Sequence, residues 1–205
     1  MQKENKLFDT QNLIKMAMMS VIAVILMQFG AIKLPGLFPS FLEIDFSEVP
    51  AIVGIIAIHP LAGIVIVILK NLLKALLFGT TSVYVGELAN LVVSLGYVVP
   101  LTLMIRKRKD IKTITIGIVL GIIGMTISGG LINYFVTIPM YAKLFMPLEA
   151  IIGMGNAINP AITDKLTLVL YAITPFNLLK GTVVAFTSVA FVKAIQPVIR
   201  HLAHR

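Results

Sequence analysis

Long apolar stretches, separated by short polar segments, are the feature that most limits how this chain can fold. A helix needs roughly 20 mostly apolar residues to cross the hydrocarbon core of a bilayer, and the chain has room for about six such helices. We expect transmembrane helices over residues 13–32, 48–59, 60–78, 86–105, 113–138 and 175–196. The sequence therefore predicts an all-α integral membrane protein with six transmembrane helices.

The composition agrees with a membrane protein that forms a single transmembrane domain over residues 1–205. Hydrophobic residues make up 58% of the chain and charged residues 13%, whereas soluble domains carry about 25% charged residues. The mean hydropathy is +0.99. The chain contains no cysteine, which excludes a disulfide framework, a thiol nucleophile and a thiolate metal site.

The distribution of basic residues indicates how the helices are oriented in the membrane. The segments expected on the inner side, 1–15, 106–112 and 193–205, hold eleven of the 17 Lys and Arg residues, and the expected outer loops hold three. Basic residues concentrate on the cytoplasmic side of membrane proteins, so both termini are expected to be cytoplasmic. This excess of basic residues explains the net charge of +8 without a nucleic acid partner. The run "RKRKD" is also typical of a contact with anionic lipid headgroups.

Polar residues within the expected helices gather in their outer halves. Charged and amide groups are costly in a bilayer and usually face a bundle interior. This distribution predicts an outward-facing ligand pocket that is closed on the inner side, rather than a proton pathway through the full depth. The residues concerned are Gln28, Asp45, Glu48, Lys70, Asn71, Lys74, Glu87, Asn90, Asn133, Asn177 and Lys180.

Several of these residues have an alternative interpretation. Asn177 and Lys180 of "PFNLLKG" share one helix face, and they either bind a ligand or form a first helical turn that faces water. Glu87 either pairs with a lysine or contacts a ligand. Lys74 can extend to the outer headgroups, and Glu48 suits the start of a helix, where the helix dipole favours a carboxylate.

The segment 33–47, "KLPGLFPSFLEIDFS", carries apolar residues outside the expected helices. Its two prolines disfavour a helix. Aromatic residues outside a membrane helix, such as Phe38, Phe41 and Phe46, indicate that this segment covers another surface. The segment either lies on the bilayer surface or forms a lid over the pocket. An apolar lid above polar groups would suit a ligand with a flat apolar part and a polar edge.

The sequence offers little support for an enzyme. It has no G-x-x-x-x-G-K-[ST] motif, so it has no P-loop for ATP hydrolysis. The three histidines, His59, His201 and His204, do not form a metal cluster by their positions, and no Ser/His/Asp set lies at one membrane depth. We expect no catalytic site, no metal site and no cofactor.

Five blocks in this chain resemble one transporter family. "FLEIDFSEVPAIVG", "HPLAGIVIVILKNLL", "GELANLVV", "NYFVTIP" and "PFNLLKG" follow one another in the family's order, and the likeness covers residues 17–190. They are similar to the riboflavin-binding S component of energy-coupling factor (ECF) transporters. The resemblance implies a multi-pass prokaryotic cell-membrane protein that captures riboflavin from outside and works with a transmembrane coupling subunit and two ATP-binding subunits.

The resemblance also implies functional residues. The flavin contacts fall on Asn133, Asn177 and Lys180, the lid on residues 33–47 with Phe41 and Phe46, and Asp45 and Glu87 lie in matching blocks. Docking of the coupling subunit falls on small residues of the first helix: Ala17, Ser20 and Ala23. The family's A-x-x-x-A spacing is not kept there, because Val21 follows Ala17 at that spacing.

Two alternatives to riboflavin uptake remain at this stage. The same fold can serve another vitamin or the phosphorylated flavin FMN. The chain can also be a membrane assembly protein without a transport role, whose buried polar groups only pair with one another.

Overall fold

The computed structural model describes residues 7–80, 82–108 and 110–203, most of them in helices. Two π-helical segments, η1 (Asn133–Thr137) and η2 (Val169–Ile173), interrupt α-helices within this part of the chain. The other elements are α1 (Thr10–Phe29), β1 (Ile32–Lys33), β2 (Glu43–Ile44), α2 (Val49–Ala57), α3 (Ala62–Phe78), α4 (Val85–Lys107), α5 (Ile111–Ile132), α6 (Ile138–Leu144), α7 (Leu148–Asn156), α8 (Lys165–Leu168) and α9 (Thr174–Ala203).

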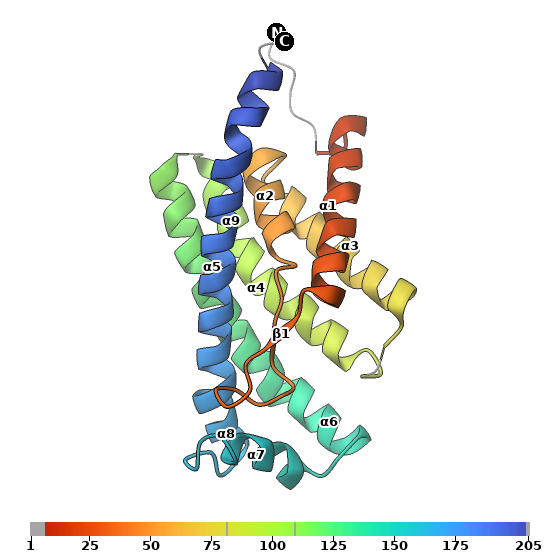
Figure 1. Ribbon diagram of the computed structural model, residues 1–205, viewed down its shortest axis with the longest axis vertical. Helices are drawn as coiled ribbons and strands as arrows, with labels where there is room; N and C mark the ends of the chain where they lie inside the picture. The colour runs from red at the N-terminus through yellow and green to blue at the C-terminus, as the bar shows by residue number, and fades with distance from the viewer. Residues whose placement is uncertain (1–6, 81, 109, 204–205) are drawn as a thin grey trace.

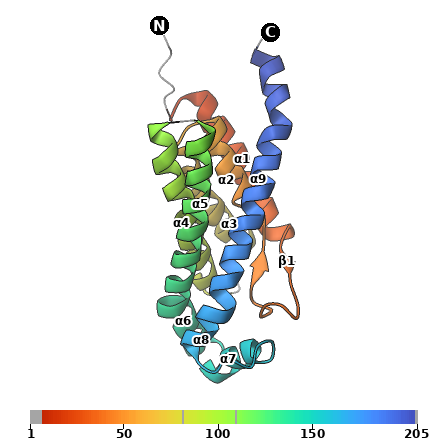
Figure 2. The same ribbon diagram turned by 90° about the vertical axis from the view of Figure 1, so that its left-hand side faces the viewer.

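The helices form an elongated bundle with two different ends. Figures 1 and 2 show that α1 begins and α9 ends at the same end of the bundle, where α4 also ends and α5 begins. The exposed basic residues Arg106, Lys107 and Lys112 belong to this end. The opposite end carries α6, α7 and α8, and the β1–β2 hairpin lies beside the half of the bundle that leads to it.

Four helical stretches in the described chain are long and apolar enough to cross a membrane: Thr10–Phe29, Val85–Lys107, Ile111–Leu144 and Lys165–Ala194. The other two expected spans are shorter, since α3 has 17 residues and α2 has nine. Nine residues rise about 13 Å, less than half of the roughly 30 Å hydrocarbon core. Every residue from Val49 to Ile55 is buried, so α2 is an internal helix of the bundle.

Two helices extend beyond the ranges expected from the sequence. The expected range 113–138 stopped before Pro139, and the range 175–196 began at Pro175, yet the described chain is helical through both prolines. The N–H of Ile138 bonds to the Asn133 carbonyl and that of Thr174 to the Val169 carbonyl, each five residues back. Each wider π turn therefore lies just before a proline, Pro139 or Pro175, which has no backbone N–H to donate.

The start of the last long helix is also earlier than expected. The elements α8, η2 and α9 follow one another without a break, so the helix begins at Lys165 and not at the expected residue 175. Asp164 caps this stretch: its side chain accepts the N–H of Thr167, and the Thr167 side chain accepts the N–H of Asp164. Such a reciprocal capping box is a strong helix-start signal.

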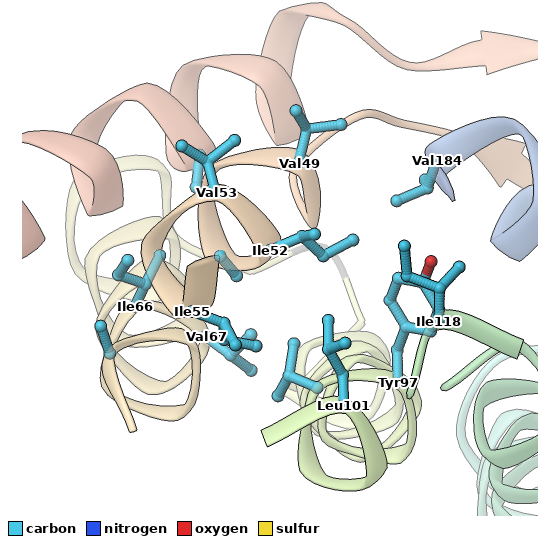
Figure 3. Close-up of a cluster of buried hydrophobic side chains, with 14 of the residues drawn as sticks. Val49, Ile52, Val53, Ile55, Ile66, Val67, Tyr97, Leu101, Ile118 and Val184 are labelled. Carbon is cyan, nitrogen blue, oxygen red and sulfur yellow. The ribbon is translucent and has the colours of Figure 1, made fainter. Parts of the chain in front are cut away.

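The hydrophobic core surrounds α2. Figure 3 shows Ile52 of α2 pointing toward Tyr97 of α4 and Ile118 of α5, with Val49 on the preceding turn of α2 and Val184 of α9 in the same cluster. These five side chains are all buried. A short apolar helix therefore occupies the centre of the bundle, enclosed by longer helices.

Glycines bring α4 and α5 into close contact. A Cβ atom on Gly124 would lie 2.2 Å from the Gly96 carbonyl oxygen, and one on Gly121 would lie 2.6 Å from the Tyr97 ring. Gly117 also faces α4, where a Cβ would lie 2.8 Å from Leu101. Small residues at this spacing are typical of helix pairs in membranes, because they let the two backbones approach.

This contact predicts that Gly124→Ala destabilises the protein. The added methyl group meets backbone rather than a flexible side chain, and overpacking of this kind costs about 1–3 kcal/mol. Thermal unfolding of the detergent-solubilised protein, followed by circular dichroism, measures the effect. Gly153→Ala in α7 is the control, because its Cβ meets nothing within 4 Å; equal melting temperatures for the two variants would contradict the prediction.

Candidate functional site

A cavity of about 340 Å³ lies between the hairpin, α4, the η1–α6 stretch, α7 and α9. Its volume falls within the roughly 300–1,000 Å³ range of small-molecule pockets. It belongs to the end of the bundle that carries α6 and α7 (Figure 1). The lining residues are Ser40, Phe41, Leu42, Glu43, Gly86, Ala89, Asn90, Val93, Asn133, Thr137, Ile138, Tyr141, Met146, Ile151, Met154, Phe176, Asn177 and Lys180.

Asn133 and Asn177, which the sequence analysis expects to contact a ligand, both line this cavity. Each amide nitrogen donates a 2.8 Å hydrogen bond to its own helix, Asn133 to the Gly129 carbonyl and Asn177 to the Ile173 carbonyl. An amide has a second N–H and an acceptor oxygen besides. These bonds fix the side chains while leaving donor and acceptor capacity toward the cavity.

Gly129 is a positioning residue that the sequence analysis missed. A Cβ there would lie 2.6 Å from the Asn177 amide nitrogen, and the Gly129 carbonyl holds Asn133. Only a glycine allows α5 and the Asn177 side chain to approach this closely. The signal in the sequence was the "SGG" run at 128–130 within an apolar helix.

Lys180 lines the cavity and is anchored by a carboxylate of the loop before α2. Its Nζ donates to Asp45 Oδ2 at 2.8 Å and lies 3.7 Å from Glu48 Oε2. Burial raises the pKa of Asp45, but the Lys180 and Lys70 ammonium groups outweigh it and leave that pKa at about 2. Asp45 therefore stays ionised; it pairs with Lys180 and is not among the lining residues.

Glu48 is the centre of a buried ion-pair network. Lys70 Nζ lies 3.0 Å from Glu48 Oε1, and the Ser94 hydroxyl donates to the same oxygen at 2.8 Å. Lys70 also donates to the Ser47 hydroxyl. Glu48 does precede α2, as expected for a helix start, but its side chain joins α3, α4 and α9. The two carboxylates and two ammonium groups of the network sum to zero charge.

Glu87 lies at the start of α4, beside the cavity wall. Its carboxylate accepts hydrogen bonds from Lys74, from Thr80 at 3.0 Å and from Ser82 at 2.9 Å. Its neighbour Gly86 lines the cavity, whereas Glu87 does not. Of the two interpretations of Glu87, the structure shows the lysine pair, and Lys74 is held by this carboxylate.

The segment expected to act as a lid forms a hairpin, with Ile32 paired to Ile44 and Lys33 to Glu43. Phe41 lines the cavity. Phe38 packs edge-on against Phe176, a lining residue of α9, with ring centroids 5.3 Å apart. Phe46 differs from the expectation: it is half-buried against the main core and does not line the cavity. The hairpin tip therefore covers the cavity, while its base belongs to the core.

The three small residues expected to dock a partner do not share an exposed face. Ala17 is exposed, but Ser20 and Ala23 are fully buried. Helix α1 packs on α2 and α3, and the Ser20 hydroxyl donates to the Met16 carbonyl at 2.8 Å. Ser20 and Ala23 therefore contribute to the packing of this chain, and Ala17 alone of the three is available to a partner.

Across the described residues, no group of three or more His, Cys, Asp or Glu side chains is arranged to hold a metal ion. The side chains of His201 and His204 lie outside the described part of the chain. In the expected cytoplasmic segments, residues 1–6, Lys109, His204 and Arg205 also lie outside the described part of the chain.

Comparison with known proteins connects this cavity to a transporter family. The sequence profile described as "ECF transporter, substrate-specific component" matches residues 11–192. The chain is 33% identical over 187 residues to the riboflavin transporter FmnP of Bacillus subtilis, covering 89% of this chain and 91% of that protein. It is 29% identical to the riboflavin transporter RibU of Staphylococcus aureus, covering 90% and 91%.

A solved structure shares the fold. It is titled "Structure and mechanism of the S component of a bacterial ECF transporter" and superposes with a TM-score of 0.72 at 28% identity, covering 92% of this chain and 97% of that one.

The ion-pair network predicts that Lys70→Met strongly destabilises the protein. The substitution leaves Glu48 buried with less positive charge beside it, which costs about 3–5 kcal/mol. Lys33→Met is the control, because the Lys33–Glu43 pair is exposed and is worth about 1 kcal/mol or less. Thermal unfolding in detergent measures both, and adding Glu48→Gln to Lys70→Met is expected to restore part of the loss. A Lys70→Met protein as stable as Lys33→Met would refute the role of the network.

Proposed function

The chain belongs to the family of substrate-specific components of ECF transporters, and we propose that its substrate is riboflavin. It is a transporter component of the cell membrane and not an enzyme. The observation that carries the riboflavin proposal is one cavity that joins two amides, an ammonium group and an aromatic hairpin tip. The riboflavin transporter names of the relatives from Bacillus and Staphylococcus support the same substrate.

The lining of the cavity suits the two ends of a flavin ring. The isoalloxazine ring has a dimethylbenzene end and a pyrimidine-dione edge with alternating donors and acceptors. Asn133 and Asn177 each offer a donor and an acceptor to such an edge. Lys180 has three N–H donors and uses one toward Asp45, which leaves donors for a ring carbonyl. Phe41 and Met154 supply apolar cover.

The charge of the site favours the free vitamin over its phosphate ester. Among the described lining residues, Lys180 is the one cation. Asp45 at 2.8 Å and Glu48 at 3.7 Å already balance it, and Glu43 adds a carboxylate to the lining. A phosphate group usually requires clustered Arg or Lys donors, so FMN is the weaker candidate.

The proposed orientation places the cavity on the outer side of the membrane. We infer six membrane segments, α1, α2, α3, α4, α5–α6 and α8–α9, with α2 and α3 as the short ones. Both termini then lie in the cytoplasm with Arg106, Lys107 and Arg108, in agreement with the excess of basic residues on that side. The hairpin and α7 face outward.

Energy for uptake is proposed to come from partner subunits. The sequence has no P-loop motif, so a transmembrane coupling subunit and two ATP-binding subunits are expected to drive transport. The exposed face of α1 around Ala17 and Val21 is the proposed docking surface for the coupling subunit, since a small residue permits close helix approach.

The binding proposal predicts that Asn177→Ala weakens riboflavin binding by about 5- to 150-fold, because it leaves buried polar groups of the ligand unpaired at about 1–3 kcal/mol. Quenching of flavin fluorescence by the purified protein measures the affinity. Asn71→Ala is a matched control: Asn71 is buried in α3 and bonds to the Val67 carbonyl in the same way, but does not line the cavity.

Wild-type affinity in the Asn177→Ala protein would remove Asn177 from the site. Wild-type protein that binds no riboflavin, or that binds FMN at least as tightly as riboflavin, would overturn the substrate proposal itself.

The docking proposal predicts that Ala17→Phe abolishes riboflavin uptake by the assembled transporter and leaves riboflavin binding unchanged. A large ring on α1 blocks close approach of the partner helix, and the cavity lies elsewhere. Uptake into proteoliposomes with and without the partner subunits tests this. Leu103→Phe, on an exposed position of α4, is the control. Accumulation against a gradient by this subunit alone would refute dependence on partners.

A further inference from the structure

We propose that Thr137 is a further ligand-binding residue, whose hydroxyl bonds to a hydroxyl group of the polyol side chain of the flavin. This inference rests on the proposed function. Its basis is a buried, unpartnered hydroxyl group in the cavity wall, at the end of the π-helical segment η1.

Thr137 behaves differently from other threonines in the long helices. The hydroxyls of Thr115, Thr126, Thr182 and Thr187 each donate to the carbonyl four residues earlier, at distances between 2.7 and 2.9 Å. This is the usual way for a threonine inside a helix to satisfy its hydroxyl. The Thr137 hydroxyl oxygen is buried, yet it has no hydrogen-bond partner within the described chain.

Thr137 is the last residue of the π-helical segment η1. The carbonyl four residues before Thr137 belongs to Asn133, and this carbonyl accepts the N–H of Ile138, five residues on. Insertions of this type occur frequently at functional sites, and here the insertion ends at a buried hydroxyl without a partner in the cavity wall.

The position of Thr137 indicates which part of the ligand it meets. Asn133, Thr137 and Tyr141 follow one another at intervals of four residues, and all three line the cavity. Asn177 packs against Gly129, one turn before Asn133, so the amides and Lys180 occupy the part of the cavity nearer the bundle centre. Thr137 lies one turn after Asn133 and directly before α6, and Figure 2 shows α6 at the end of the bundle.

The chemistry of the two groups is complementary. A threonine hydroxyl donates one hydrogen bond and accepts others, as does each hydroxyl of a polyol chain. Threonine in a helix has two accessible χ1 rotamers, so its hydroxyl can turn toward a ligand. A buried hydroxyl without a partner is unfavourable, and a polyol in the cavity removes that penalty.

The test compares Thr137→Val, which keeps the shape of the side chain, with wild-type protein on two ligands. Riboflavin carries the polyol chain, and lumiflavin has a methyl group in its place. We expect Thr137→Val to weaken riboflavin binding by about tenfold and to leave lumiflavin binding unchanged. Fluorescence quenching measures both affinities.

Two further variants keep the test specific. Thr126→Val in α5 removes a hydroxyl that is bonded to its own helix and does not line the cavity, so it is expected to change neither affinity. Thr137→Ser keeps the hydroxyl and is expected to retain riboflavin affinity.

The outcomes separate this inference from the proposed function. Unchanged riboflavin affinity in Thr137→Val overturns it, and an equal loss for riboflavin and lumiflavin overturns the assignment to the polyol chain. Wild-type protein that binds neither flavin overturns the riboflavin proposal and this inference with it.

Discussion

The buried ion pairs around Glu48 are the interaction on which the rest of the structure depends. Charged side chains in a bilayer are tolerated when they pair inside the bundle, and Glu48 has Lys70 at 3.0 Å and Lys180 at 3.7 Å. Asp45 completes the set by binding Lys180. The pairs connect the loop before α2 to α3 and to α9, so they fix both the place where the chain enters the core and the place where an ammonium group reaches the cavity.

The cavity itself depends on two departures from regular helix. The π segments η1 and η2 precede Pro139 and Pro175, and they let each helix continue past a residue that cannot donate an N–H. As a result, Asn133, Thr137 and Asn177 belong to continuous helices that line one cavity. Gly129 then allows these helices to approach until the Asn177 side chain meets the α5 backbone. The site is therefore built mainly on helices, and residues of the hairpin complete its lining.

The sequence predicted the parts of the site that are chemically unusual in an apolar helix. Asn133, Asn177 and Lys180 stood out because amides and ammonium groups are costly in a membrane, and all three line the cavity. Partners distant in the sequence did not stand out: Asp45 and Lys180 are 135 residues apart, and no local pattern joins them. The sequence also did not show which face of α1 is exposed, because lipid-facing and core-facing positions of a membrane helix are both apolar. Ala17 and Ala23 are the same residue type, yet Ala17 is exposed and Ala23 is buried.

The position of Lys180 links the occupancy of the cavity to the hairpin that covers it. Its ammonium group holds Asp45, which follows directly after β2, and the same group lines the cavity. A ligand acceptor that bonds to Lys180 therefore contacts the ammonium group that anchors the base of the hairpin, whose charge Asp45 and Glu48 already balance. An uncharged acceptor such as a ring carbonyl adds a hydrogen bond without competing strongly for the ion pair. An anionic group would compete with Asp45 for Lys180 and loosen the hairpin base, so the network that stabilises the fold also favours a neutral ligand.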